Sequence, residues 1–252
     1  MEDEKRVTIK KNPFALDGVK TINKLKHSRF SSDVYRLIFD GSEVQFVGME
    51  GKALPLCPED HPSKKYLSYG SSITSNSITY LPTLSFPSLI AKRFGLDLIN
   101  KGFSGSCRME KEVADYLASF PDFEFATFEF GINVIGEWDE KTFEEKLHYF
   151  LSTVLNAHLD KTFYIIDIFS YFNENCGNVS KEKVENYRQI VKKELKMIRH
   201  PNAIYIRGDE LLLGRDKLCG DLVHPDIDGH QEIYRHLEKI ISLKYGKNEE
   251  EK

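Results

Sequence analysis

Five short runs of β-forming residues alternate with longer amphipathic stretches from residue 65 onward, and this alternation restricts the fold more than any other feature of the chain. Strands that are separated by helices pair in parallel, because a parallel pair needs a long crossover connection. Helices in those crossovers cover both faces of the sheet. We therefore predict an α/β fold with a parallel sheet of about five strands. The runs are KYLSYG (65–70), LDLIN (96–100), FATFEF (125–130), TFYIIDIF (162–169) and AIYIR (203–207).

The intervening stretches have the apolar spacing of helices that lie on a sheet. In one of them Phe143, Leu147 and Val154 recur at intervals of four and seven residues, which places them on one face of a helix. Each such stretch can bury its apolar face against the strands. The predicted helices lie near 86–94, 109–117, 143–155, 184–198 and 233–243.

The N-terminal part of the chain has a different character. Residues 34–47 (VYRLIFDGSEVQFV) form two β-rich runs joined by the dipeptide DG, which suits a two-residue hairpin turn. The segment CPEDHPSKK (57–65) contains two prolines and mixed charges, which are typical of a linker. We therefore predict a small N-terminal β appendage with its linker at 1–60 and the main domain at 61–252.

Composition excludes several classes of protein. The 252 residues are 40% hydrophobic and 29% charged with a formal net charge of −4, which is ordinary for a globular protein and gives no basic surface for nucleic acid. No apolar run approaches the roughly 18 residues of a membrane-spanning helix, and the opening MEDEKRVTIKK lacks the apolar region of a secretory signal. The four cysteines form no CxxC pair, so we expect reduced, mostly buried thiols. We expect a cytoplasmic protein with neither nucleic acid nor a membrane as partner.

Polar segments follow the first three predicted strands and precede the last helix. In a parallel sheet, ligands bind beyond the carboxyl ends of the strands, so residues in these segments are candidates for a functional site. The segments are GSSIT (70–74), NKGFSGSCR (100–108), FGINVIGEW (130–138) and CGDLVHPDIDGH (219–230).

Together these segments contain the groups that a serine esterase needs. Such an enzyme requires a hydroxyl beside a neutral imidazole, a carboxylate that orients the imidazole, and donors for the developing oxyanion. His224 and Asp221 are three residues apart, so one loop can present both to a serine. Gly105 can offer a main-chain N–H that no Cβ obstructs, and Asn133 can offer its amide. Taken singly, each segment has a simpler interpretation as a helix cap or a turn.

In this order the four segments resemble the four blocks of the SGNH (GDSL-type) hydrolases, a family of esterases and lipases. The resemblance covers roughly residues 65–244. GSSIT is similar to the Gly-Asp-Ser block, INKGFSGS to the second block, FGINV to the Gly-x-Asn-Asp block and DLVHP to the Asp-x-x-His-Pro block. The resemblance implies a flavodoxin-like three-layer α/β/α sandwich. The implied site residues are Ser72 as nucleophile, Asp221 and His224 as its partners, and Ser72, Gly105 and Asn133 as oxyanion donors.

Two positions depart from the family pattern. Ser71 stands where the family has an aspartate before the nucleophile, and Val134 stands where it has an aspartate after the asparagine. A subgroup of carbohydrate-active esterases that is similar at YGSSIT and GFSGSCRMEKEV also lacks the first aspartate, and carries a β domain in front of the hydrolase domain. We expect Ser71 to brace the surrounding loops by hydrogen bonds.

The resemblance implies a serine esterase that needs neither cofactor nor metal and hydrolyses short-chain acyl esters, with acetyl esters of a carbohydrate as the expected substrate. Its partner would be a small acylated molecule such as an acetylated sugar, and the sequence leaves homo-oligomerisation open. A second interpretation also stays open because two family aspartates are absent. In that interpretation the chain is a catalytically weak or inactive SGNH-like protein that binds a glycan or an acylated ligand.

The last polar segment has a rival interpretation as a carboxylate-rich metal site. Its ligands would be Asp221, His224, Asp226, Asp228 and His230. We favour a structural role for the later residues, with Asp226 or Asp228 capping the last helix and His230 exposed on it.

Four further side chains need an explanation of their own. His148 and His158 fall on an amphipathic helix, where we expect both at the surface. Trp138 can line a pocket or pack against the core. Glu129, inside an apolar strand, would be costly to bury unpaired, so it should face the strand end or meet a cation.

Overall fold

The computed structural model of the chain describes residues 34, 46–49, 51, 54–79, 81–172 and 179–246. Nearly all of the predicted hairpin at 34–47, and with it the predicted appendage, lies outside the described residues. The predicted linker includes a short 3-10 turn, η1 (Pro58–Asp60).

Five parallel strands form a single sheet in the order β2-β1-β3-β4-β5, which confirms the predicted fold class. This order is that of flavodoxin-like sheets, and in it the direction of winding reverses between β1 and β3. The carboxyl ends of these two neighbours therefore flank the crevice in which such folds bind ligands. The strands are β1 (Lys65–Gly70), β2 (Asp97–Gly102), β3 (Phe125–Glu129), β4 (Thr162–Ile166) and β5 (Ala203–Ile206).

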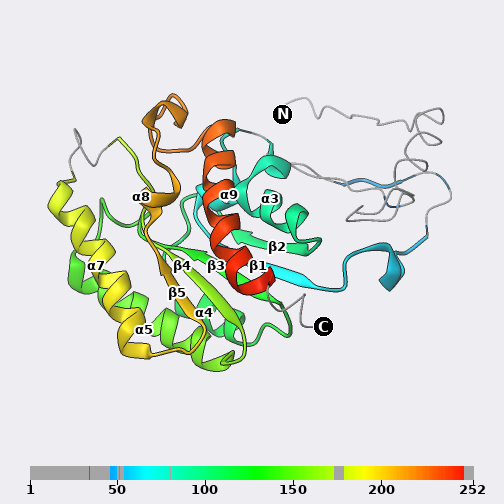
Figure 1. Cartoon of the computed structure of the whole chain (residues 1–252), viewed down its shortest axis with the longest axis horizontal. Coiled ribbons are helices and arrows are strands. Elements are labelled where there is room, and N and C mark those ends of the chain that lie inside the picture. Colours follow the sequence, from blue (N-terminus) through cyan, green and yellow to red (C-terminus); the bar gives the residue numbers. More distant parts are fainter. Residues whose placement is uncertain are drawn as a thin grey trace.

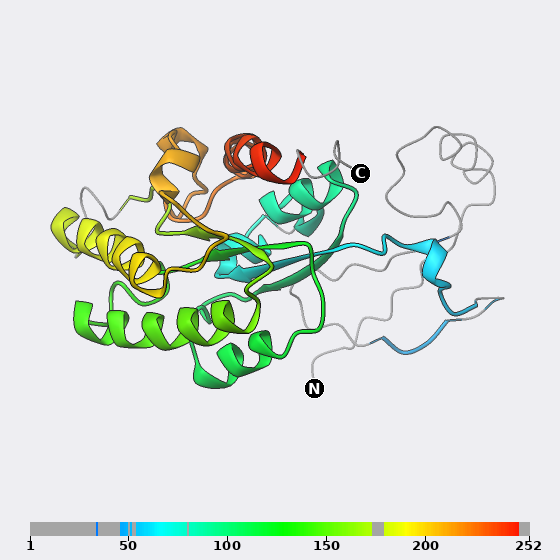
Figure 2. The same ribbon diagram turned by 60° about the horizontal axis from the view of Figure 1, so that its bottom comes forward.

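Helices cover both faces of the sheet, so the sheet is the middle layer of a three-layer sandwich (Figures 1 and 2). None of the helices in the described part of the chain combines the length and hydropathy that a bilayer crossing needs. One face carries α4 (Lys111–Ala118), α5 (Glu140–Ala157) and α7 (Lys181–Ile198), and the other carries α3 (Phe86–Arg93), α8 (Gly208–Leu211) and α9 (Ile227–Ile241). Shorter turns are α2 (Ser72–Ser75), η2 (Pro82–Leu84), η3 (Arg215–Lys217) and the π-helical η4 (Ser242–Gly246).

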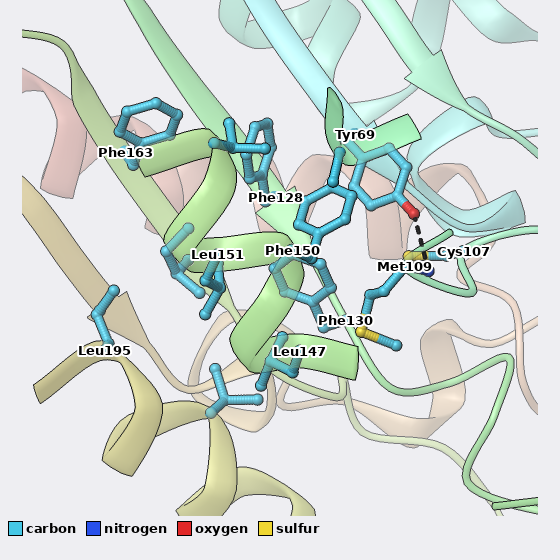
Figure 3. Close-up of a cluster of buried hydrophobic side chains, with 14 of the residues drawn as sticks. Tyr69, Cys107, Met109, Phe128, Phe130, Leu147, Phe150, Leu151, Phe163 and Leu195 are labelled. Carbon is cyan, nitrogen blue, oxygen red and sulfur yellow. Dashed lines mark hydrogen bonds between the residues drawn. The ribbon is translucent and has the colours of Figure 1, made fainter. Parts of the chain in front are cut away.

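An aromatic core fills the space between the sheet and α5. Tyr69 of β1 stacks on Phe150 of α5 with ring centroids 4.8 Å apart, and Phe128 and Phe130 pack beside them (Figure 3). The Tyr69 hydroxyl accepts a hydrogen bond of 3.4 Å from the main-chain N–H of Met109. Because these rings are buried and closely packed, they hold the end of β1 in a fixed position.

Side-chain caps explain why several helices begin before the apolar spacing starts. Ser85, Asp139, Ser180 and Asp226 each accept a hydrogen bond from a main-chain N–H in the first turn of the helix that follows. Apolar spacing detects only the buried face, so the predicted starts of α5 and α9 fell several residues late. Of the two residues predicted as the cap of α9, Asp226 is the one that caps it.

Two predictions about histidines are wrong. His158 ends α5 and is buried, with its Nε2 bonded to the carbonyl of Leu117 at 3.0 Å. His230 is 1% exposed because the first turn of α9 packs against the start of α3. Its Nδ1 accepts a bond from the N–H of Phe86 at 3.4 Å, and burial lowers its pKa to about 3, so the ring is neutral.

The predictions for His148 and for the cysteines agree only in part with the structure. His148 is half exposed and bonds Glu194, a buried residue of α7, at 2.7 Å. Cys107 is buried and Cys219 partly buried, whereas Cys57 is exposed on the segment before β1. Cys57 is therefore an exception to the expected burial, and Cys176 lies outside the described residues.

Candidate active site

The predicted site residues meet at the carboxyl edge of the sheet. Ser71 and Ser72 directly follow β1, and Asn133 lies in the turn after β3, the neighbouring strand. The loop between η3 and α9 crosses toward them and contributes His224. Ser72 and His224 thus meet beyond the carboxyl end of β1, beside the strand that leads to Asn133.

Three side chains form a continuous chain of hydrogen bonds. The Oγ of Ser72 lies 2.6 Å from Nε2 of His224, and Nδ1 of His224 lies 2.5 Å from Oδ2 of Asp221. Ser72 is 5% exposed, whereas the side chains of His224 and Asp221 are 19% and 41% exposed. The hydroxyl therefore sits at the bottom of the site and the carboxylate at its solvent side. A serine, an imidazole and a carboxylate in this order can transfer a proton away from the hydroxyl.

The loop that carries His224 is folded back on itself. Oδ1 of Asp221 accepts the N–H groups of Val223 and His224, each at 3.0 Å, and the N–H of Cys219 donates to the carbonyl of His224 at 2.7 Å. Between them Leu222 adopts a left-handed conformation with φ of 57°, which is unfavourable for a leucine. Its surroundings thus hold this backbone in a conformation that presents Asp221 and His224 on the same side.

The same contacts determine the charge of Asp221. Partial burial acts to raise the pKa of its carboxyl, but bonds from the N–H groups of His224 and Val223 and from the imidazole outweigh it. The pKa of Asp221 therefore lies below its usual value. An ionised carboxylate bonded to Nδ1 leaves Nε2 as the acceptor that faces Ser72.

The two adjacent serines have different roles in the structure. Ser71 caps α2, since its Oγ accepts from the N–H of Ile73 at 3.1 Å, and the same hydroxyl donates to the carboxylate of Glu129. Ser72 instead points at His224. Ser71 thus braces the turn as predicted, and its side chain faces away from the imidazole.

Glu129, the last residue of β3, faces the strand end, which is one of the two predicted outcomes. Its donors are the N–H and hydroxyl of Ser71 and the hydroxyl of Thr74, at 2.8–2.9 Å, in place of a cation. Burial raises the pKa of its carboxyl, while the bonds from Ser71 and Thr74 act in the opposite direction.

The two predicted oxyanion donors belong to segments that contact each other. Gly105 adopts a left-handed conformation with φ of 70°, and a Cβ on it would meet no atom within 4 Å. Two residues further on, the N–H of Cys107 donates to Oδ1 of Asn133 at 3.0 Å. Since this bond occupies the amide oxygen, the NH₂ group of Asn133 is the end that can serve a ligand.

Two other candidates from the sequence, the metal site and Trp138, can be compared with the structure. No group of three or more histidine, cysteine or acidic residues in the described part of the chain could hold a metal ion, so the rival metal site gains no support. Trp138 packs against the core on the α5 side, and the cationic ends of Arg108 and Lys146 lie 5.8 and 5.5 Å from its ring. Of the two interpretations of Trp138, packing is the one that these contacts favour.

Thr74 and Cys107 take part in the site's hydrogen bonds, although sequence reasoning assigned them no role. Thr74 donates to Glu129, and Cys107 connects the main chain of Glu129 to Asn133. The sequence did contain a signal for Thr74. A buried glutamate requires hydrogen-bond donors, and residues with hydroxyl groups directly follow β1. For Cys107 we find no such signal in the sequence.

The sequence profile described as the GDSL-like lipase/acylhydrolase family matches residues 63–242. No curated protein matches the chain. Among solved structures, a protein from Bacteroides ovatus described as GDSL-like lipase superposes with a TM-score of 0.61 at 23% identity, over 73% of this chain and 54% of that one. This chain thus spans about half the length of that relative.

Two further structures share the fold at lower identity. A carbohydrate esterase family 2 enzyme with a carbohydrate binding domain, from Corynascus thermopiles, superposes with a TM-score of 0.59 at 15% identity, over 77% of this chain and 69% of that one. The psychrotrophic esterase EstA from Pseudoalteromonas sp., in a structure inhibited by monoethylphosphonate, gives a TM-score of 0.57 at 14% identity, over 73% and 99%.

Proposed function

Because the chain belongs to the GDSL-like lipase/acylhydrolase family, we propose that it is a serine esterase in which Ser72 is the nucleophile. The observation that carries this proposal is the bonded sequence Ser72–His224–Asp221, with contacts of 2.6 and 2.5 Å. A pairing of this kind has no evident structural purpose for a nearly buried hydroxyl at the end of a strand, whereas ester hydrolysis requires it.

In the proposed reaction Ser72 Oγ attacks the ester carbonyl while its proton passes to Nε2 of His224. Asp221 holds the imidazole by Nδ1 and stabilises the imidazolium that forms. The carbonyl oxygen becomes an oxyanion, which accepts hydrogen bonds from the N–H groups of Ser72 and Gly105 and from the NH₂ of Asn133. His224 then returns the proton to the departing alcohol. A water, deprotonated by the same imidazole, releases the acid and restores Ser72.

The proposed substrate is a short-chain acyl ester, with acetylated carbohydrate as the expected alcohol component. Support comes from the exposed edge of the site, where Asp221 and Leu222 lie open to solvent, and from the shared fold with an enzyme described as a carbohydrate esterase. A bulky, polar alcohol can approach such an edge without entering the protein core. The family itself includes esterases and lipases, so the choice of acyl chain belongs to this proposal.

A chain-length series tests the substrate proposal. We expect p-nitrophenyl acetate to be hydrolysed faster than the butyrate, and the decanoate slowest, with acetylated sugars also accepted. Faster hydrolysis of the decanoate than of the acetate would contradict the short-chain assignment.

Labelling tests the chemistry separately. A fluorophosphonate should phosphonylate the protein, and mass spectrometry of the labelled peptide should locate the group on Ser72. A folded protein that neither turns over any ester nor takes the label would favour the alternative of a ligand-binding protein without activity.

A further inference from the structure

Glu129 is a buried acidic side chain that the proposed reaction does not use. It is 1% exposed and lies at the end of β3. This strand pairs with β1, which leads into the turn at residues 71–74 that contains Ser72, the nucleophile turn. Burying a carboxylate is costly unless donors surround it. The hydrogen bonds of its carboxylate therefore indicate the role of an acidic side chain at this position.

Among the described residues, every hydrogen bond of the carboxylate comes from the turn that carries Ser72. Oε2 accepts from the N–H of Ser71 at 2.9 Å, from the hydroxyl of Ser71 at 2.8 Å and from the hydroxyl of Thr74 at 2.9 Å. Oε1 accepts from the Ser71 hydroxyl at 2.9 Å. The donors lie on both sides of Ser72 in sequence, so the carboxylate ties the turn to β3 before and after the nucleophile.

The end of β1 is shaped to let the carboxylate reach the turn. A Cβ on Gly70 would lie 2.6 Å from Oε2 of Glu129 and 2.2 Å from Oγ1 of Thr74, distances at which atoms overlap. Only glycine at this position leaves room for both groups. The contact is thus built into the strand as well as into the side chains.

Glu129 also touches the segment that is proposed to bind the oxyanion. Its main-chain carbonyl accepts from Sγ of Cys107 at 3.0 Å, and the N–H of Cys107 donates to Asn133. One residue therefore connects the nucleophile turn with the loop that orients the Asn133 amide.

We propose that Glu129 is a positioning residue, whose hydrogen bonds to Ser71 and Thr74 hold Ser72 in line with His224. The inference rests on the proposed function. Through these bonds the carboxylate from the neighbouring strand braces a turn in which Ser71 carries a hydroxyl in place of the aspartate of the family pattern. A displacement of the hydroxyl by about 1 Å can lower the rate by about 10²-fold, so such bracing has a large effect on kcat.

Two substitutions of Glu129 separate hydrogen bonding from size. In Glu129→Gln the amide oxygen can replace Oε2 and accept from Ser71 and Thr74, and its NH₂ can donate to a lone pair of the Ser71 hydroxyl. In Glu129→Leu a side chain of similar size accepts nothing, and the donors lose their partner. We expect Glu129→Leu to lower kcat for p-nitrophenyl acetate, and the rate of phosphonylation at Ser72, about 10²-fold with KM within threefold. Glu129→Gln should keep both rates within tenfold.

Glu194→Leu is the matched control. Glu194 is equally buried, at 1% exposure of its side chain, but it lies on α7 and bonds His148. We expect both leucine variants to lower Tm, and only Glu129→Leu to lower kcat. If Glu129→Leu does not fold, Thr74→Val removes one donor in an otherwise similar side chain and should lower kcat several-fold.

Three results would overturn the inference. The first is an unchanged kcat and labelling rate in a folded Glu129→Leu, or in Thr74→Val if that variant has to replace it. The second is a fall in the kcat of Glu194→Leu as large as that of Glu129→Leu. The third is a fall in the kcat of Glu129→Gln as large as that of Glu129→Leu, which would assign the effect to charge. If the wild type itself shows neither turnover nor a label on Ser72, the proposed function fails first and the inference with it.

Discussion

Two buried carboxylates lie at the carboxyl edge of the sheet, and their partners differ. Asp167 follows β4 and is bonded by the N–H of Gly208 at 2.7 Å and by the Tyr205 hydroxyl, with the Arg188 guanidinium 3.6 Å away. Glu129 ends the adjacent strand β3 and is bonded by hydroxyls and an N–H of the Ser71–Thr74 turn. One carboxylate meets a cation from α7, and the other meets the turn that holds the proposed nucleophile.

The difference suggests how position on the sheet determines the use of a buried acid. Burial raises the pKa of both groups, that of Asp167 to about 6. Asp167 lies beside strands whose ends carry no proposed reacting group, so its bonds serve packing and stability. Glu129 lies at the reversal point of the winding, where ligands bind in such sheets. We therefore expect changes on the β1–β3 side to affect rate, and changes on the β4–β5 side to affect stability.

The largest expected effect is that of Ser72→Ala. Loss of the nucleophile should lower turnover of p-nitrophenyl acetate by about 10⁴-fold or more, roughly 5.4 kcal/mol, and abolish fluorophosphonate labelling. The fold should persist, since the change removes one oxygen from a short turn. Thermal unfolding and steady-state kinetics on the same sample check both statements. Turnover within tenfold of the wild type would exclude Ser72 as nucleophile.

Asn133→Ala comes next. The usual cost of one lost oxyanion donor is about 10²–10³ in kcat, or roughly 2.7–4 kcal/mol. The loss should fall on kcat rather than KM, because the bond strengthens as charge develops on the oxygen. Asn202→Ala, which alters an asparagine before β5 that bonds the carbonyl of Leu159, is the matched control and should leave kcat unchanged. A rise in KM with constant kcat would make Asn133 a binding residue.

On the β4–β5 side the expected effect is on stability and its pH dependence. The pKa of Asp167 is raised from 3.8 to about 6 by burial, so the folded state binds its proton more tightly than the unfolded state. Its contribution to the free energy of unfolding is then complete below about pH 4 and is lost as the pH rises toward 6, by about 3 kcal/mol. Asp167→Asn should flatten this slope, as measured by urea unfolding at pH 4 to 7, and leave kcat within twofold. An unchanged slope would contradict the assignment.

Sequence reasoning recovered the parts of the structure that depend on local pattern. The strands, the helices and the four polar segments follow from apolar spacing and from the position of polar residues after strands. Asp167 escaped notice because a single acid in the run TFYIIDIF carries no sign of the arginine that approaches from α7. His230 was misplaced because its burial depends on how α9 packs against α3, a long-range contact. Glu129 was flagged by the cost of burial, but its donors could be identified only from the pairing of β1 with β3.

The smallest expected effect is that of Ser71→Ala, and it tests how the bracing of the nucleophile turn is shared. The substitution removes the hydroxyl that caps Ile73 and donates to Glu129, but the N–H of residue 71 and the hydroxyl of Thr74 still bond the same carboxylate. With these bonds intact, Ser72 should keep its alignment with His224. We therefore expect kcat and labelling within about tenfold of the wild type, a cost of at most about 1.4 kcal/mol. Two results would reverse the assignment of the two serines: a phosphonyl group on Ser71 in the wild type, or a loss of kcat in Ser71→Ala as large as that in Ser72→Ala. Either result would place the reacting hydroxyl on the side of the turn that faces Glu129.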